Sequence, residues 1–246
     1  MSRVKHNAVH QFSAGLNNAQ NTGPASLPFQ LAGLQGWKVV TENFQTGHIY
    51  STNTAPWEET VENAGGASVA ANGALLTATG TDNDSALLQW TTANVLPGAS
   101  TKKFYLETSC TLTAATMASN EMFIGFTEDA QGVNFAAGDG TAWTFADGVG
   151  FGKLDTATEI DFISGKNDAW QTVGFGSTFT TAVRTTLGAY YDGTTFYLYK
   201  DGALVASSAK EIINDDAPTG VSCFVKCGTG AAQTLLVNYV TYASEL

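Results

Sequence analysis

Short runs of alternating apolar and polar residues recur along most of this chain, and clusters of turn-forming residues separate them. Alternation with a period of two is typical of β-strands that bury one face. No long amphipathic helix is evident, although short helical turns are expected at residues 114–120 and 210–215. The pattern predicts an all-β protein with strands at residues 48–52, 73–79, 85–90, 103–112, 121–127, 148–152, 159–164, 170–176, 220–227 and 233–244, and three more between residues 185 and 208.

Two Asp-Gly pairs divide residues 185–208 into a three-stranded meander. Asp192-Gly193 and Asp201-Gly202 each stand between alternating apolar residues, and this pair tolerates the positive φ of a tight primed hairpin turn. Many antiparallel strands at such spacing predict two stacked sheets. No strict repeat of roughly 20 to 50 residues is present, which argues against propellers and solenoids.

The chain changes character near residue 40. Residues 1–36 are rich in Asn, Gln, Ala and Gly and show no sustained strand or helix period. We interpret residues 1–39 as an extended N-terminal arm and residues 40–246 as one sandwich domain. Large apolar side chains seek a surface to cover, so we expect the arm to lie on its own sandwich or on a neighbouring subunit. The residues predicted to make this contact are Phe12, Leu16, Leu27, Phe29 and Leu31.

The formal net charge is −11, and the acidic excess lies in residues 61–246, because residues 1–60 hold three basic and three acidic residues. An acidic body repels nucleic acid and anionic membranes, so neither is expected as a partner. No early apolar run resembles a signal peptide, and no run is long enough to span a membrane. Synthesis in a cytoplasm is therefore expected.

The cysteines and histidines argue against a disulfide, a metal site and a nucleophilic enzyme. Along an extended strand Cys223 and Cys227 stand about 13 Å apart, so these two residues and Cys110 are predicted to be free core thiols. No cysteine or carboxylate stands beside His6 and His10, so neither a metal nor another cofactor is expected. No histidine lies beyond residue 48, which removes the usual base for a Ser or Cys nucleophile.

The order of the apolar runs resembles a known fold family over roughly residues 40–246: GALLTAT, SALLQW, KFYLETSCTL, EMFIGFTED, DGVGFGKL, the meander, and TLLVNYVTYAS. This order is similar to the concanavalin A-like lectin/glucanase jelly roll, also called laminin-G-like, and most closely to the version in virion proteins of tailed bacteriophages. The resemblance implies a two-sheet antiparallel jelly-roll sandwich whose last strand pairs beside the first. Such a scaffold serves for sugar binding, glycan cleavage or assembly, and the fold alone does not choose among these.

Glu159-Ile160-Asp161 resembles the start of the Glu-x-Asp-x-(x)-Glu strand of the glucanases with this fold, in which three carboxylates share one sheet face. A retaining glycosidase needs a nucleophile and an acid/base about 5 Å apart. The positions available for the last carboxylate hold Ile163 and Ser164. No catalytic residue is therefore assigned, and the protein is predicted not to be an enzyme. Glu159 and Asp161 are then interpreted as the solvent-facing residues of an alternating strand.

Carbohydrate binding without catalysis is the alternative function. A lectin needs a polar cleft, often with an aromatic platform and a calcium ion bound by loop oxygens. Trp143 and Trp170 lie in or beside predicted loops and are the candidate glycan contacts, although core packing is an equal expectation for such large side chains. The run from Asp82 to Asp84 offers three side-chain oxygens, but Asp and Asn in turns more often bond their own backbone.

The sequence thus leads to the hypothesis of a non-enzymatic virion protein of a tailed phage, a capsid decoration or cement protein made in the host cytoplasm. Its arm would bind the capsid surface, and its partners would be the major capsid protein and copies of itself, expected as trimers. Deleting residues 1–36 is expected to abolish incorporation and to leave a folded β domain. The alternative is a lectin-like module of a phage fibre or spike that binds a host glycan.

Overall fold

The computed structural model describes residues 37–44, 57–70, 72–90, 102–128, 135, 142–213, 217–228, 230 and 232–245. The predicted strand at residues 48–52 and the five apolar arm residues lie outside these ranges. Within them the chain is almost entirely β-structure, with one short 3-10 helix at Met117–Ser119. The helix falls in the expected turn at residues 114–120, whereas residues 210–213 are not helical.

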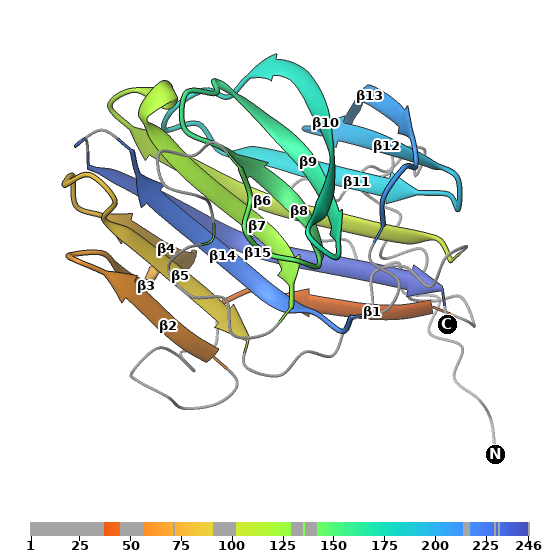
Figure 1. Ribbon diagram of the computed structural model, residues 1–246, viewed down its shortest axis with the longest axis horizontal. Helices are drawn as coiled ribbons and strands as arrows, with labels where there is room; N and C mark the ends of the chain where they lie inside the picture. The colour runs from red at the N-terminus through yellow and green to blue at the C-terminus, as the bar shows by residue number, and fades with distance from the viewer. Residues whose placement is uncertain are drawn as a thin grey trace.

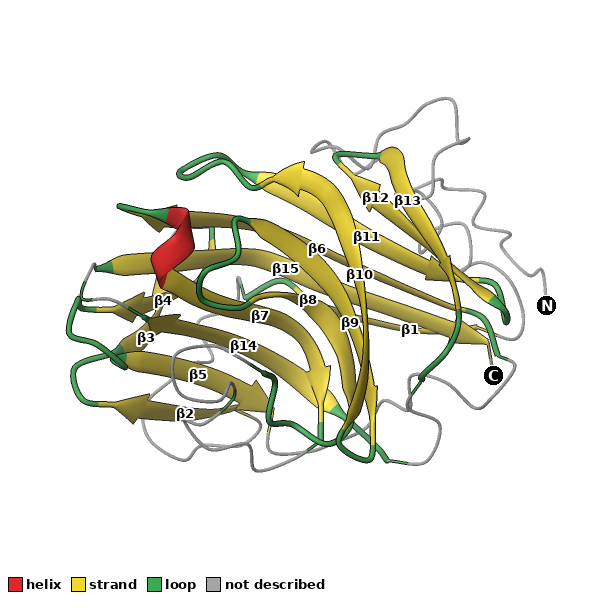
Figure 2. Cartoon of the chain, turned by 45° about the horizontal axis from the view of Figure 1, so that its top comes forward, coloured by secondary structure: helices red, strands yellow, loops and turns green. Residues whose placement is uncertain are grey.

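The strands form two antiparallel sheets that stack face to face (Figures 1 and 2), as the sequence predicts for a jelly-roll sandwich. The eight-stranded sheet consists of β1 (Trp37–Glu42), β3 (Gly66–Ala70), β4 (Gly73–Ala78), β6 (Phe104–Ala114), β11 (Thr185–Tyr191), β12 (Thr195–Lys200), β13 (Ala203–Ala209) and β15 (Gln233–Glu245). The seven-stranded sheet consists of β2 (Trp57–Glu62), β5 (Ser85–Trp90), β7 (Asn120–Thr127), β8 (Gly148–Lys153), β9 (Glu159–Lys166), β10 (Ala169–Thr178) and β14 (Gly220–Cys227).

Strand β15 organises the eight-stranded sheet. Strand β6 pairs with it along one side, while along the other side β4 pairs with residues 233–237 and β1 with residues 240–245. The C-terminal end of β15 therefore lies beside β1, as Figure 1 shows. This pairing confirms the expectation that the last strand lies next to the first.

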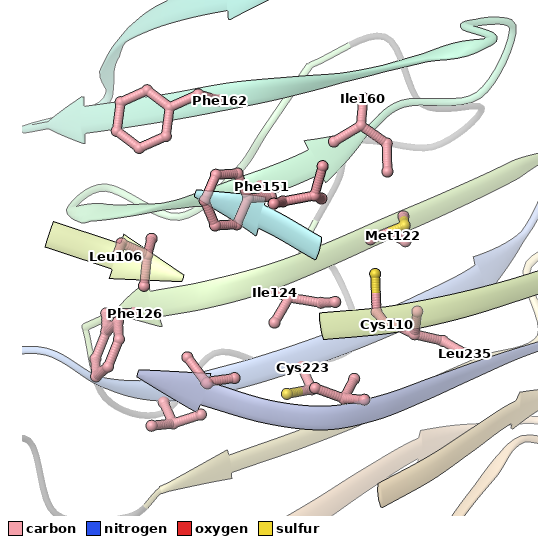
Figure 3. Close-up of a cluster of buried hydrophobic side chains, with 14 of the residues drawn as sticks. Leu106, Cys110, Met122, Ile124, Phe126, Phe151, Ile160, Phe162, Cys223 and Leu235 are labelled. Atoms are coloured by element: carbon pink, nitrogen blue, oxygen red, sulfur yellow. The ribbon is translucent and has the colours of Figure 1, made fainter. Parts of the chain in front are cut away.

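A single hydrophobic core fills the space between the sheets (Figure 3). Each strand contributes alternate residues, because successive side chains of a strand point to opposite faces. Phe126, Phe151 and Phe162 of the seven-stranded sheet are fully buried there, and each such side chain contributes about 1.5–3 kcal/mol by leaving water. The cysteines Cys110, Cys223 and Cys227 are buried and free, as predicted.

Three strands, β1, β2 and β3, and the arm boundary differ from the prediction. Strands β2 and β3 fall within residues 57–70, where WEETVE and GASVA carry charged or small residues in place of a clear apolar alternation. Strand β2 is an edge strand next to β5, and charge is tolerated at a sheet edge. Strand β1 begins at Trp37, so residues 37–39 belong to the sandwich rather than to the arm.

The two Asp-Gly pairs form different turns. Asp201 and Gly202 have φ values of 50° and 81°, as a primed two-residue turn requires. At the other pair only Gly193 has positive φ. There the Asp192 carboxylate accepts hydrogen bonds of 2.8 Å from the backbone N–H groups of Thr194 and Thr195. The prediction of a primed turn is wrong at this position, because the Asp side chain closes a longer loop instead.

Candidate functional site

The outer face of the seven-stranded sheet, which points away from the core, is covered by aromatic side chains of the same chain. Strands β5, β7, β9 and β14 each place one large buried apolar residue on this face, between neighbours that point into the core. Three further aromatic residues from the connection between β7 and β8 pack onto them. We call the seven residues the aromatic cluster: Leu87, Phe123, Ile163 and Phe224 on the strands, and Phe135, Trp143 and Phe145 above them.

Ring contacts in the aromatic cluster centre on Phe123. Its ring centroid lies 4.9 Å from that of Phe135, 5.1 Å from that of Phe145 and 5.7 Å from that of Trp143. Phe135 also stacks on Phe224 at 5.1 Å with an interplanar angle of 24°. Offset and edge contacts of this kind stabilise by about 0.5–1.5 kcal/mol each beyond area burial. The cluster is therefore a second small core on the outside of the sheet.

Glycines of β8 let these rings lie directly on the sheet. A methyl group at Gly152 would lie 2.5 Å from Trp143 Cη2 and 2.8 Å from Ile163 Cδ1, closer than real Cβ contacts. A methyl group at Gly150 would overlap the ring of Phe123. The alternation Gly-Val-Gly-Phe-Gly thus places Val149 and Phe151 in the core and leaves room for aromatic rings on the opposite face.

Hydrogen bonds tie the connection before β8 to the sheet. Glu128 Oε1 accepts a hydrogen bond of 2.6 Å from the Ala146 N–H, and Glu128 Oε2 accepts one from the Asp147 N–H. Burial raises the pKa of Glu128, although these hydrogen bonds act to lower it. The indole of Trp170 donates to the Phe145 carbonyl at 3.0 Å. Glu128, which directly follows β7, and Trp170 of the edge strand β10 therefore fix the segment that covers the aromatic cluster.

The two candidate glycan contacts differ in exposure. Trp143 is 6% exposed and lies within the aromatic cluster, so its ring packs on protein and presents no open face to a sugar. This is the core-packing alternative, favoured because the glycines of β8 let the indole lie against the backbone. Trp170 is half-buried at the margin of the cluster, with its ring edge-on to Phe145 at 6.4 Å. Only Trp170 of this pair lies at the surface.

The acidic pair of β9 lies on the same outer face. A methyl group at Gly174 would lie 3.4 Å from Asp161 Oδ1 and 3.9 Å from Glu159 Oε2, so both carboxylates stand over β10. Partial burial, and then the charge of Glu159, raise the pKa of Asp161. The next residue on this face is Ile163 of the aromatic cluster. The hydroxyl of Ser164 donates a hydrogen bond of 2.9 Å to the backbone carbonyl of Ile212. Strand β9 therefore brings two carboxylates together and no third.

In the candidate calcium loop, the run from Asp82 to Asp84, the carboxylate of Asp84 forms hydrogen bonds within the turn. Asp84 Oδ2 accepts hydrogen bonds from the Thr79 hydroxyl at 2.6 Å and the Thr81 N–H at 3.0 Å. Among the described residues no group of three His, Cys, Asp or Glu side chains is placed to bind a metal ion. In the same part of the chain no helix is long and apolar enough to cross a membrane.

Charged residues are buried at one end of the seven-stranded sheet. Lys226 Nζ lies 4.0 Å from Glu121 Oε2, and both side chains are at most 4% exposed. Lys153 donates to the carbonyls of Asn120 and Leu154 at 2.6 and 3.0 Å. Burial lowers the pKa of Lys153 to about 8, although Asp155 and Glu121 act to raise it. Glu121 and Lys226 alternate with the core residues Met122 and Val225 and so lie on the outer side of the sheet, whereas Lys153 shares the side of Phe151.

A second outer face, on the eight-stranded sheet, carries a buried carboxylate that the sequence did not single out. Glu107 of β6 is 1% exposed, and its two carboxylate oxygens accept hydrogen bonds of 2.6 Å from the hydroxyls of Tyr105 and Tyr239. Burial raises the pKa of Glu107 to about 7, although these two hydrogen bonds act to lower it. With their neighbours on β11 and β12 these residues form what we call the tyrosine face: Tyr105, Glu107, Tyr190, Tyr197, Tyr199 and Tyr239.

The tyrosine face results from the alternation of side chains between the two sides of each strand. Leu106 and Cys110 of β6 lie in the core, so Tyr105 and Glu107 point outward. In register with them stand Tyr190 and Gly188 of β11, then Tyr197 and Tyr199 of β12. Tyr190 and Tyr197 stack at 6.2 Å. The alternating tyrosines in the sequence were the available signal, and they became meaningful only with the strand register.

No protein-family model and no curated protein matches the sequence. Solved structures match its fold. Peanut lectin, solved with a 9mer peptide, covers 84% of this chain and 97% of its own at 15% identity, with a TM-score of 0.57. The carbohydrate recognition domain of Emp47p covers 86% and 98% at 10% identity, with a TM-score of 0.57. The endo-1,3-β-glucanase from Streptomyces sioyaensis covers 86% and 98% at 14% identity, with a TM-score of 0.55.

These likenesses show that the chain has the concanavalin A-like jelly-roll fold. Their names describe a lectin, a carbohydrate recognition domain and a glucanase. Binding and catalysis both occur on this fold, so the fold by itself leaves the activity open. The choice between them depends on the two outer faces of the sandwich.

Proposed function

We propose that this protein is a non-enzymatic structural protein of a tailed phage that decorates the capsid surface. The observation that carries the proposal is the aromatic cluster, which fills the outer face of the seven-stranded sheet with buried side chains of the chain itself. Side chains that fill the outer face in this way make the sheet rigid, which suits a domain that is displayed on a capsid. The resemblance of the strand order to phage virion proteins supplies the phage context.

The acidic pair supports the non-enzymatic part of the proposal. Hydrolysis of a glycosidic bond requires one carboxylate to act as acid and a second to act as nucleophile or base. Glu159 and Asp161 stand on the same strand at its exposed end, and the aromatic cluster begins at the next outward position, Ile163. Both carboxylates come from one strand and stand over β10, so they would meet a sugar ring from the same side.

The N-terminal arm supplies the attachment in this proposal. Residues 1–36 carry Arg3 and Lys5 and no acidic residue, whereas the remaining chain has a net charge of −13, from 9 basic and 22 acidic residues. Phe12 and Leu16 are large apolar groups in the distal part of the arm. Many weak contacts of such arms, repeated over a shell of major capsid proteins and neighbouring trimers, add up to stable attachment.

Capsid binding by the purified chain tests the proposal. Capsids from a phage deleted for this gene would be mixed with the wild-type chain, with Phe12→Ser/Leu16→Ser, and with Leu204→Ser as the matched control. Leu204 is an apolar residue that is 57% exposed on the sandwich. We expect the wild type and the control to co-sediment with capsids and to appear on their surface by electron cryomicroscopy, and the arm variant to remain in solution. Equal decoration by all three chains would overturn the role of the arm.

Carbohydrate binding is the second candidate, and the exposure of Trp170 favours it. Its half-buried indole lies on the same outer face as Glu159 and Asp161, opposite Gly165 and four residues along β9 from Asp161, and a surface indole of this kind suits a sugar ring. A glycan array with and without calcium would be read for the wild type and Trp170→Ala. Binding that this substitution abolishes would establish a lectin-like module of a fibre or spike that attaches to a host glycan.

A further inference from the structure

We propose that two copies of this chain associate through β13, the last strand of the eight-stranded sheet, which pairs antiparallel with β13 of the second copy across a two-fold axis. The pairing joins the two eight-stranded sheets into one continuous sheet. A contact of a surface with its own copy closes as a dimer. The inference concerns the isolated protein and does not depend on the proposed capsid role.

Strand β13 has a free side. It pairs with β12 along one side, and in the order of the sheet no described strand follows it on the other side (Figure 1). Strand β10 of the other sheet meets β13 near its C-terminal end, where the Gln171 side chain donates to the Ala209 carbonyl at 2.7 Å. An edge strand presents a row of N–H and C=O groups, which readily pair with a strand of another chain.

The residues of β13 leave this edge open to pairing. Edge strands are commonly protected by charged side chains or proline. The edge strand β2 (WEETVE) carries three glutamates, whereas β13 (ALVASSA) carries neither charge nor proline. Leu204 and Val205 are 57% and 41% exposed there. Because the chain has a formal net charge of −11, an uncharged edge is a place where two copies can approach without opposing carboxylates.

A β-bulge in β13 selects the register of the pair. The pairing with β12 shifts between Leu204 and Ala206, so Val205 has no partner on β12. Ala206 packs against the core, and Leu204 and Ser207 on either side of it stand on the outer face. A two-fold axis through Ala206 sets Leu204 of one copy opposite Ser207 of the other. Opposed residues of antiparallel strands share a face, so this register keeps the inner and outer faces of both copies aligned.

The same register brings opposite charges together at both ends of the pair. When Val205 is left out of the count, Asp201 stands four positions before the axis and Lys210 four positions after it. Asp201 of each copy therefore lies near Lys210 of the other. The next residues outward, Lys200 and Glu211, are also of opposite sign. Opposite charges across an antiparallel pair favour association, and this match points to a second copy of the same strand as the partner.

Light scattering coupled to size-exclusion chromatography of the full-length chain tests the pair. We expect the wild type to reach twice the 25.8 kDa mass of a single chain as its concentration rises. In Val205→Lys two like charges stand beside the axis, so the dissociation constant of the pair is expected to rise at least about tenfold. Val183→Lys is the matched control, because Val183 is 49% exposed in the connection before β11, and it is expected to pair as the wild type does.

A mixing experiment separates loss of pairing from loss of folding. The chains Val205→Lys and Val205→Glu are each expected to be monomeric. An equimolar mixture is expected to restore the pair, because the axis places position 205 of one copy near position 205 of the other and the two charges then attract. Pairs that form in the mixture require both variants to be folded.

Three results would overturn the proposal: a wild-type chain that stays monomeric at millimolar concentration, a wild-type trimer, and a Val205→Lys chain that pairs as tightly as Val183→Lys. A mixture of the two position-205 variants that stays monomeric would also contradict an axis at Ala206. The chain Phe12→Ser/Leu16→Ser, designed against capsid binding, is expected to pair like the wild type, so the two proposals fail separately.

Discussion

At the scale of single residues, Glu107 has an unusual environment. It lies on the outer side of a sheet, yet it is buried and bonded to two tyrosine hydroxyls at 2.6 Å. The fragment Tyr-Leu-Glu-Thr-Ser-Cys shows which positions share a side of the strand. It does not show which side is covered, because that depends on what packs on the sheet.

The raised pKa of Glu107 predicts a specific pH dependence of stability. The carboxyl titrates at about 7 in the folded protein and near 4.3 in an unfolded chain. Between these values the folded state binds more protons than the unfolded state, so the free energy of unfolding falls as pH rises. We expect Glu107→Gln, which keeps an acceptor for the tyrosines, to remove a loss on the order of 3 kcal/mol between pH 5 and pH 8.

Urea unfolding at the two pH values measures this effect as a difference between the wild type and Glu107→Gln. Burial also raises the pKa values of Glu128 and Asp161, and their contributions are present in both proteins and cancel. Parallel pH profiles for the two proteins would show that the carboxyl of Glu107 titrates normally when folded.

At the scale of elements, strand β8 links the two cores of the molecule. Its sequence Gly-Val-Gly-Phe-Gly-Lys places Val149 and Phe151 in the main core and leaves the opposite side free of side chains where the aromatic cluster lies. Alternation predicted the strand. The role of its glycines emerged only when Trp143 and Phe123 were found on top of them.

A substitution at Gly152 tests this packing. In Gly152→Ala the new methyl group would lie 2.5 Å from Trp143 Cη2, so the indole must shift. We expect a loss of about 1–3 kcal/mol in the free energy of unfolding, together with a change in tryptophan fluorescence. Gly174→Ala is the matched control on the same face, since its methyl group would approach Asp161 at an ordinary 3.4 Å. Equal stability of the two variants would mean that the aromatic cluster does not pack tightly against β8.

At the scale of the whole molecule, the sandwich buries its three cysteine thiols between the two sheets. Cys110, Cys223 and Cys227 all lie in the main core. Burial raises the pKa of Cys110 to about 12 and that of Cys223 further still, so the thiolate form is suppressed at neutral pH.

Thiol titration with a chromogenic disulfide reagent tests the closure of the fold. We expect no reaction in the native protein and reaction of all three cysteines in denaturant. Ser207→Cys, at an exposed position on β13, is the positive control and is expected to react in the folded state. Rapid labelling of a native cysteine would show that the two sheets separate readily.

The sequence by itself determined the β-strands, their order and the jelly-roll sandwich, because alternation and turn residues act locally along the chain. It also predicted the free thiols and showed that Ile163 stands where a third carboxylate would be needed. It missed β1, β2 and β3 and the form of the first Asp-Gly turn, and it left open whether Trp143 packs on protein or faces solvent. Only the tertiary structure decided that both sheets carry buried side chains on their outer faces. The physical reason is that strand periodicity distinguishes two faces, whereas burial depends on segments distant in sequence that pack against them.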